Sequence, residues 1–245
     1  MKIFLSALEN GSVSYYGGIY QLDLLYNLMS YYYLRNNLSV AEVVRDKSKL
    51  IMIDSGAHSF QKGKQVDWEQ YTREYADFIE KFDRPNVVGY FEMDVDNLLG
   101  YDKVLRLRKI LEAKSDKIIP VWHKNRGLDD FKKMCQDYAG KVIAITGFKN
   151  EDIKDEQYMM FLKYAKKYKC KVHCLGMTRK KVLDKVPFDY VDSSSWKQGA
   201  IYGRIGNRKI DRNFNKNNYP EVYLQAYLEG MKMQRQYERR WKLYE

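Results

Sequence analysis

LIMIDSGAHSF at residues 50–60 and YVDSSSW at residues 190–196 are the two segments from which the fold of this chain is predicted most directly. In the first, a continuous apolar run ends in Asp54, and in the second Asp192 follows a shorter apolar run. Continuous apolar runs are typical of strands that are buried on both faces, as in parallel sheets. Acidic residues at the carboxyl ends of such strands are typical of a parallel α/β barrel, which presents its catalytic groups at one rim.

A simpler interpretation stays open for each acid, because aspartate often starts a turn or caps the following helix. Packing explains the second segment poorly, however, since Asp192 is followed by three serines and Trp196. An aspartate and three hydroxyls are unfavourable in a core unless they find hydrogen-bond partners. We therefore interpret Asp192 as a functional residue.

Strand and helix patterns alternate along most of the chain, which predicts a parallel sheet that is either closed as a barrel or doubly wound. The expected strands are residues 2–8, 50–53, 86–95, 117–123, 141–147, 171–175 and 190–192. The expected helices are residues 19–34, 38–44 with Ser39 as N-cap, 68–82, 98–113, 128–138, 156–168, a short helix capped by Thr178, and 219–244. Polar or glycine residues recur at the strand ends, namely Asp54, Asp94, His123, Gly147, Gly176 and Asp192. This recurrence favours the barrel, a (β/α)8 TIM-type fold of regular or irregular form.

The length of 245 residues suits one α/β barrel or two small domains. Because linkers and low-complexity tracts are absent from the sequence, we expect a single domain, residues 1–245, with a basic loop and helix at 197–245. The net charge is +11, and residues 197–245 contain eleven Lys or Arg against five Asp or Glu, a difference of 11 − 5 = 6. Such an excess indicates an anionic partner such as nucleic acid, although solubility alone would also explain it.

Several classes of protein and site are disfavoured by the sequence. It has neither a long uncharged apolar run nor a secretory signal, and its three cysteines lack disulfide spacing, so we expect a cytoplasmic protein. On a strand, Cys170 and Cys174 share one face and His173 the other, so these three cannot close a tetrahedral zinc site, and no metal is expected. Neither a Walker pattern nor a GxGxxG fingerprint occurs, which disfavours nucleotide triphosphate chemistry, and no serine or cysteine sits in a nucleophile elbow with a histidine partner. No redox or nucleotide cofactor is expected.

The acids at the strand ends suit displacement at a sugar carbon. One carboxylate can attack the anomeric carbon and hold the sugar as an ester, while a second carboxylic acid transfers the proton.

Four segments, in order, resemble the tRNA-guanine transglycosylases. DSGAHSF at 54–60 is similar to their DSGGFQ segment, and KVHCLGMTRKKVLDKVPFDYVDSSSW at 171–196 to the segment that ends in their nucleophile. VWHKNRGLDDFKKM at 121–134 occupies the place of a base-contacting VQG segment, and IAITGF at 143–148 resembles an IGGL segment. The resemblance covers about residues 50–196.

The resemblance implies a role for each matching residue. Asp192 would be the nucleophile and Asp54 the acid/base, and Asp94, with Asp96 as the less favoured choice, would read the purine edge. The backbone of Gly147 and the ring of His123 would contact the purine O6. Phe60 would stack on the base, and Ser55, Gly56 and Gly176 would line the same substrate site.

The chain also departs from the family. No cysteine or histidine follows Asp192, so the zinc site of the tRNA-acting members is missing, and the chain is much shorter. The short, zinc-free relatives are phage and bacterial enzymes that exchange guanine in DNA for a 7-deazaguanine. The resemblance therefore implies DNA base exchange, in the host cytoplasm for a phage protein. The residues expected to contact the DNA backbone are Lys197, Arg204, Arg208 and Arg212, with Arg235, Arg239 and Arg240 beyond them. A tRNA transglycosylase, a hydrolytic glycosylase and a non-catalytic nucleic-acid-binding protein are also compatible with these residues.

Overall fold

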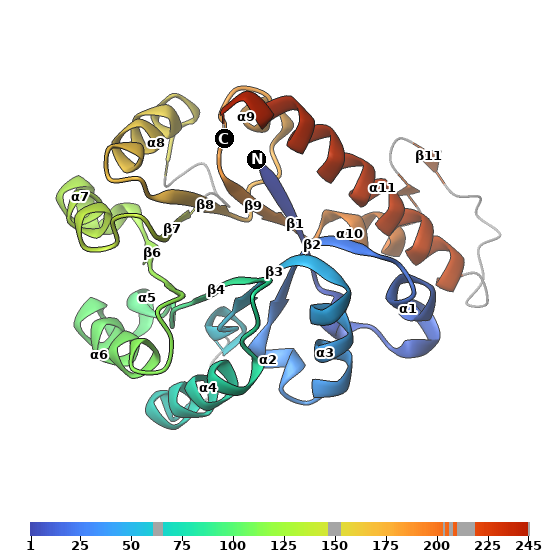
Figure 1. Cartoon of the computed structure of the whole chain (residues 1–245), viewed down its shortest axis with the longest axis horizontal. Helices are drawn as coiled ribbons and strands as arrows, with labels where there is room; N and C mark the ends of the chain where they lie inside the picture. Colours follow the sequence, from blue (N-terminus) through green and yellow to red (C-terminus); the bar gives the residue numbers. More distant parts are fainter. Residues whose placement is uncertain (61–65, 147–152, 203, 206–207, 210–218, 245) are drawn as a thin grey trace.

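The computed structural model describes residues 1–60, 66–146, 153–202, 204–205, 208–209 and 219–244. Its main sheet has the strand order β5-β4-β3-β2-β1-β9-β8-β7-β6, and every neighbouring pair is parallel. The strands are β1 (Lys2–Ser6), β2 (Leu24–Ser30), β3 (Ser48–Asp54), β4 (Val87–Phe91), β5 (Ile118–Ile119), β6 (Val121–Trp122), β7 (Val142–Thr146), β8 (Lys171–Leu175) and β9 (Tyr190–Ser193). Figure 1 shows them as a nearly closed ring surrounded by helices.

The ring joins at Pro120, the single residue between β5 and β6. Proline has no N–H to donate, but the Pro120 carbonyl accepts a hydrogen bond from Ala144 of β7 at 2.9 Å. On the other side, β5 pairs with β4. The buried Glu92 carboxylate reinforces this junction, because it accepts the N–H of Val121 at 2.5 Å and forms an ion pair with Arg108 at 2.6 Å. The nine strands thus fill eight positions of a TIM-type α/β barrel, which confirms the expected fold.

Most helices lie outside the ring, between successive strands (Figure 1). They are α1 (Val13–Tyr20), α2 (Tyr31–Leu34), α3 (Leu38–Lys47), α4 (Trp68–Phe82), α5 (Asp96–Leu99), α6 (Tyr101–Glu112), α7 (Gly127–Asp137), α8 (Tyr158–Lys167), α9 (Lys180–Leu183), α10 (Ser195–Ile201) and α11 (Tyr219–Trp241). A second, two-stranded antiparallel sheet pairs β10 (Arg204–Ile205) with β11 (Arg208–Lys209). In the part of the chain described, no helix has both the length and the apolar character needed to cross a bilayer.

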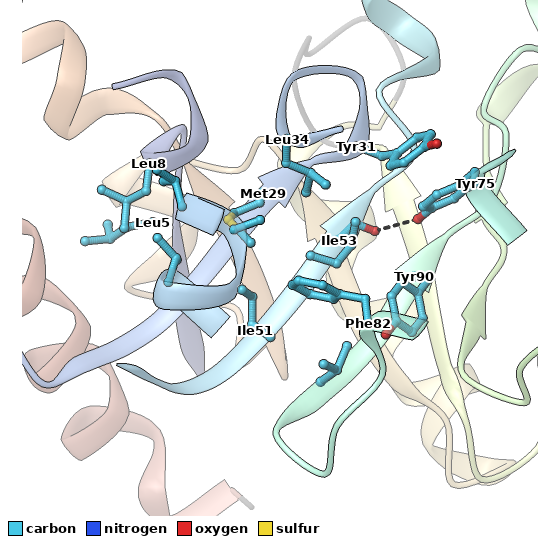
Figure 2. Packing of buried hydrophobic residues seen from close by; sticks show 14 of the residues in the cluster. Leu5, Leu8, Met29, Tyr31, Leu34, Ile51, Ile53, Tyr75, Phe82 and Tyr90 are labelled. Carbon is cyan, nitrogen blue, oxygen red and sulfur yellow. Dashed lines mark hydrogen bonds between the residues drawn. The ribbon is translucent and has the colours of Figure 1, made fainter. Parts of the chain in front are cut away.

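The core has an outer and an inner layer. Figure 2 shows part of the outer layer, where Ile51 and Ile53 of β3 pack beneath the helices and the Tyr75 hydroxyl donates to the Ile53 carbonyl at 3.2 Å. The inner layer fills the barrel with side chains that include Phe4, Phe91 and Tyr190. Because barrel strands bury both faces, their apolar runs are continuous.

The predicted helix at residues 19–34 is wrong. The chain there ends α1 at Tyr20 and then forms β2, a strand that lies between β1 and β3. Tyr26 and Leu28 fill the barrel, while Leu24 and Met29 pack in the outer layer. Since both faces of β2 are buried, its apolar positions have no strand period, and spacing alone does not distinguish it from a helix.

Several predicted boundaries also differ. Asn37 rather than Ser39 precedes α3, and Arg179 rather than Thr178 precedes α9. The strand expected at 86–95 ends at Phe91, so Asp94 lies in a loop and Asp96 begins α5. The helix expected at 98–113 divides at Gly100, whose φ of 78° favours glycine.

Helix α11 packs on the barrel itself. Gln234 donates hydrogen bonds to the carbonyls of Ile3 at 2.8 Å and Tyr26 at 2.6 Å, and Tyr227 donates to Asn27 at 2.6 Å. Farther along α11, Glu238 lies 3.8 Å from Lys49 at the start of β3. The end of α11 that carries Arg235, Arg239 and Arg240 therefore lies beside the amino ends of the strands. This is the opposite end of the barrel from Asp54 and Asp192.

Candidate active site

Asp192 lies in β9 at the carboxyl-terminal rim and is held by two hydrogen bonds. Its Oδ1 lies 2.9 Å from Nε2 of His173 in β8, and it accepts the backbone N–H of Gly176 at 2.8 Å. The His173 ring is fully buried, with Phe4, Phe91 and Tyr190 around it. Because Asp192 is 16% exposed and both of these bonds go to Oδ1, Oδ2 is the oxygen suited to attack a substrate.

Asp54 is the last residue of β3. Its Oδ2 accepts the N–H of Gly56 at 2.9 Å. Burial raises the pKa of Asp54 to about 7, helped by the negative charges of Asp94 and Asp192 and opposed by the Gly56 hydrogen bond. A carboxyl group with a pKa near neutrality can both donate and accept a proton at physiological pH, as acid/base catalysis requires.

Asp54 and Asp192 share the same rim of the barrel, although 192 − 54 = 138 positions separate them in the sequence. Asp54 ends β3, and β9 carries Asp192, with β2 and β1 between these strands. The negative charge of Asp192 contributes to the raised pKa of Asp54. The two carboxyl groups have different surroundings. Asp192 is held by hydrogen bonds from a histidine and a glycine, whereas burial raises the pKa of Asp54.

A second polar cluster lies after β4 and β6, and it contains Asp94, Asp96 and His123. The Nε2 atom of His123 lies 2.5 Å from Oδ1 of Asp94 and 3.8 Å from Oδ1 of Asp96. Burial lowers the pKa of His123, but its hydrogen bond to Asp94 and the charges of Asp94 and Asp96 outweigh burial, so this pKa is raised overall. Asp94 and His123, the two residues expected to contact the base, are thus hydrogen-bonded to each other.

The glycines after the strand ends have clear local roles. Gly56 adopts a φ of 73°, and a Cβ atom there would lie 2.3 Å from Cβ of Tyr32. Gly176 adopts a φ of 61°, and its N–H contacts Asp192. Glycine therefore lets the backbone N–H groups approach the two acids closely. Gly147 lies outside the described residues.

Ser55 and Phe60 are both buried near Asp54. The Ser55 carbonyl accepts the Tyr71 hydroxyl at 2.7 Å. Phe60 is 9% exposed, and its ring contacts those of Tyr32, Trp68 and Tyr71. These contacts place Phe60 in the hydrophobic core. They account for this ring without the base-stacking role that the resemblance implied.

Two rim residues were not identified from the sequence as site residues, Glu9 and His173. Glu9 is 7% exposed and follows β1. Its Oε1 accepts the Ser30 N–H at 3.2 Å, and burial raises its pKa to about 7. Its position after a strand is the same signal that identified Asp54. His173 lies inside a strand pattern, where a histidine is as easily a core residue, so no sequence signal marked it.

The basic residues expected to contact nucleic acid are described in part. Lys197 lies in α10, half-buried, with its Nζ 6.0 Å from the centre of the Tyr16 ring, and its charge lowers the pKa of Glu9. It is therefore at the rim. Arg204 and Arg208 belong to β10 and β11, and their side chains are outside the described part, as is all of Arg212.

The solved structure of orotidine 5'-phosphate decarboxylase from Thermotoga maritima is similar to this chain at 14% sequence identity, over 78% of this chain and 88% of that chain, with a TM-score of 0.46. Neither the protein-family models nor the curated proteins gave a match. TIM-type barrels carry their active sites at the carboxyl-terminal rim, where Asp54 and Asp192 lie in this chain.

Proposed function

We propose that this protein is a base-exchange transglycosylase that replaces guanine in DNA with a 7-deazaguanine. One observation carries the proposal: Asp54 and Asp192 lie at the same carboxyl-terminal rim of the barrel, with different surroundings. Burial leaves Asp54 able to exchange a proton near pH 7. Asp192 presents Oδ2 while its Oδ1 is held by His173 and Gly176.

The first half of the reaction uses Asp192 as the nucleophile. Oδ2 attacks C1′ of the deoxyribose, and the bond from C1′ to N9 of guanine breaks. Neutral Asp54 donates its proton to the departing guanine. The product is a glycosyl ester on Asp192, and Asp54 is left as a carboxylate.

The second half of the reaction repeats these steps in reverse, with 7-deazaguanine in place of guanine. The incoming 7-deazaguanine gives its N9 proton to the Asp54 carboxylate, and N9 attacks C1′ as the ester bond to Asp192 breaks. Asp54 is then protonated again and Asp192 is free. No proton is gained or lost over the cycle, so no redox partner or nucleotide is consumed.

The purine edge would meet the second cluster of the rim. Asp94 and His123 provide an acceptor and a ring nitrogen 2.5 Å apart, which suits the adjacent amine, N1 and O6 groups of guanine. The bond between the two side chains would be replaced by bonds to the base. A stacked base must first leave the duplex, which costs a few kcal/mol.

One feature favours DNA over tRNA. The sequence after Asp192 contains no cysteine or histidine for the zinc site of the tRNA-acting family. Lys197 lies in α10, which follows β9 at the same rim, and it can meet a phosphate of either nucleic acid. Experiment distinguishes base exchange from two alternatives, hydrolysis of the glycosidic bond and nucleic-acid binding without catalysis.

The test is to incubate the purified protein with guanine-containing duplex DNA and an isotope-labelled 7-deazaguanine, and to follow the bases by mass spectrometry. We expect labelled base in the DNA, free guanine in equal amount, and a covalent adduct on the wild-type protein. Parallel reactions with tRNA, and with DNA but no incoming base, report tRNA exchange and hydrolysis. DNA that is bound but never exchanged would refute the proposal.

A further inference from the structure

We propose that Asp94, Asp96 and His123 bind a divalent metal ion at the carboxyl-terminal rim. One ligand atom from each residue lies within 4.8 Å of the other two. The ligands come from the segments that follow β4 and β6, with Asp96 as the first residue of α5, and β5 neighbours β4 in the barrel. The site therefore rests on two adjacent strand ends. It departs from the expectation that the protein binds no metal.

The distances fit an ion after small side-chain movements. Nitrogen and oxygen ligands lie about 2.1 Å from zinc, so two ligand atoms are about 3 Å apart at right angles and about 3.4 Å apart at the tetrahedral angle. The distances from His123 Nε2 are 2.5 Å to Asp94 and 3.8 Å to Asp96. One distance is shorter and the other is longer than the separation between two zinc ligands.

Asp96 supplies an independent reason to expect a ligand. Its side chain is 5% exposed, and neither of its carboxylate oxygens has a hydrogen-bond partner among the described residues. A buried carboxylate without partners is strongly unfavourable, and a bound cation would remove that deficit. The backbone hydrogen bonds at the start of α5 go to the carbonyls of Val95 and Asp96 and leave the Asp96 side chain for the ion.

Arg126 does not take the place of the ion. Arg126 is a cationic side chain next to His123, and its Nε lies 3.2 Å from Asp130. Its guanidinium also packs 4.1 Å from the centre of the Tyr101 ring, and it donates to the Val121 carbonyl. Arg126 is thus held by other groups.

The ligand set indicates the class of metal. One imidazole nitrogen and two carboxylate oxygens, without a thiolate, suit zinc or manganese better than soft ions. Three protein ligands leave at least one position for water or substrate, as in catalytic rather than structural zinc sites. Asp94 and His123 are 26% and 16% exposed, so the open position can face solvent.

The metal site does not depend on the proposed exchange reaction, because Asp54 and Asp192 are not among its ligands. It does share Asp94 and His123 with the proposed base contacts. A bound ion would therefore stand between these side chains and the base, and it is expected to change the affinity for a 7-deazaguanine. That effect links the two proposals without making one rest on the other.

The experiment uses the full-length protein, stripped with a chelator and titrated with Zn²⁺ and, separately, Mn²⁺ by calorimetry. We expect saturable binding of one ion per chain. Asp96→Asn, which keeps the size of the side chain, should weaken binding at least tenfold. The exposed Asp102 provides the matched control, and Asp102→Asn should bind as wild type.

A second variant and readout guard against misfolding. Electron paramagnetic resonance of bound Mn²⁺ should show nitrogen coupling, which His123→Gln should remove while the far-ultraviolet circular dichroism stays unchanged. The ion should also raise the melting temperature of wild type more than that of either variant. Absence of saturable binding up to millimolar ion, or equal affinity in wild type and Asp96→Asn, would overturn the inference.

The two proposals fail in different ways. A protein that binds the ion but exchanges no base would refute only the exchange reaction. Base exchange by a protein that binds no ion, with no effect of the chelator, would refute only the metal site.

Discussion

Asp54-Ser55 and Asp192-Ser193 are two copies of the same local sequence, and their surroundings in the barrel differ. Asp54 ends β3, accepts one N–H from Gly56 and relies on burial, which raises its pKa to about 7. Asp192 accepts from a neighbouring strand as well, through His173, and from Gly176. An acid at a strand end therefore acquires its chemistry from its burial and its hydrogen-bond donors rather than from its own sequence.

The largest effect is expected at Asp192. Asp192→Asn removes the nucleophile, so base exchange should fall on the order of 10⁴-fold or more and the covalent adduct should disappear. Steady-state exchange and intact-protein mass spectrometry measure these outcomes. Asp102→Asn, an exposed site on α6, is the control and should exchange normally. Full activity in the Asp192→Asn protein would end the assignment of the nucleophile.

Asp54→Asn should lower exchange by about 10²- to 10⁴-fold, the usual range for loss of a general acid/base. In wild type, guanine release needs neutral Asp54, so single-turnover release should decline as pH rises through about 7. The variant should lose this decline. A variant that kept the decline would assign it to another group, with Glu9 the first candidate because its pKa is also about 7.

The pH dependence of stability provides a separate test of Asp54. Its pKa is about 7 in the folded protein against an ordinary 3.8, so between these values the folded state binds more protons than the unfolded state. The free energy of unfolding should therefore fall as pH rises from about 4 to about 7. Denaturant titrations across this window should show a shallower fall in Asp54→Asn. Glu9 contributes a slope of the same sign, so some fall should remain.

His173 should have an intermediate effect, because it acts through Asp192. His173→Leu removes the donor to Oδ1 and should lower kcat by about 10- to 100-fold with little change in KM. His173→Gln can restore an N–H donor and should recover part of the loss. If both variants were equally impaired while remaining folded, the hydrogen bond to Asp192 would not explain the role of His173.

The smallest effect compares two glycines. Gly56 and Gly100 both have φ near 75°, but a Cβ atom at Gly56 would clash with Tyr32, whereas at Gly100 nothing described lies within 4 Å. Gly100→Ala should cost about 2 kcal/mol from backbone strain alone, because a φ of 78° with a ψ of 156° is a conformation that essentially only glycine adopts. Gly56→Ala should cost about 3 kcal/mol, since steric overlap adds to the strain. Equal losses in denaturant unfolding would show that the loop at Asp54 adapts to a side chain.

Some elements of the barrel were predicted correctly from the sequence and others were not, for physical reasons. The helix at 68–82 was predicted with the observed bounds, because one polar and one apolar face repeat through α4 and Asp67 caps it with a hydrogen bond to Gln70. The strand β2 was missed because both of its faces are buried. The broken strand at Pro120 was expected as one strand, and only its pairing with two neighbours shows how it closes the ring.

Local sequence patterns were sufficient to predict the alternation of strands and helices and to place Asp54, Asp94, His123 and Asp192 near strand ends, because apolar runs and turn residues act locally. Contacts in the folded barrel were needed to learn which donors meet which acids, that Asp94 faces His123, and that Asp96 is buried without a hydrogen-bond partner among the described residues. These properties depend on distances between segments far apart in the chain. Barrel closure sets those distances, and no local pattern encodes them.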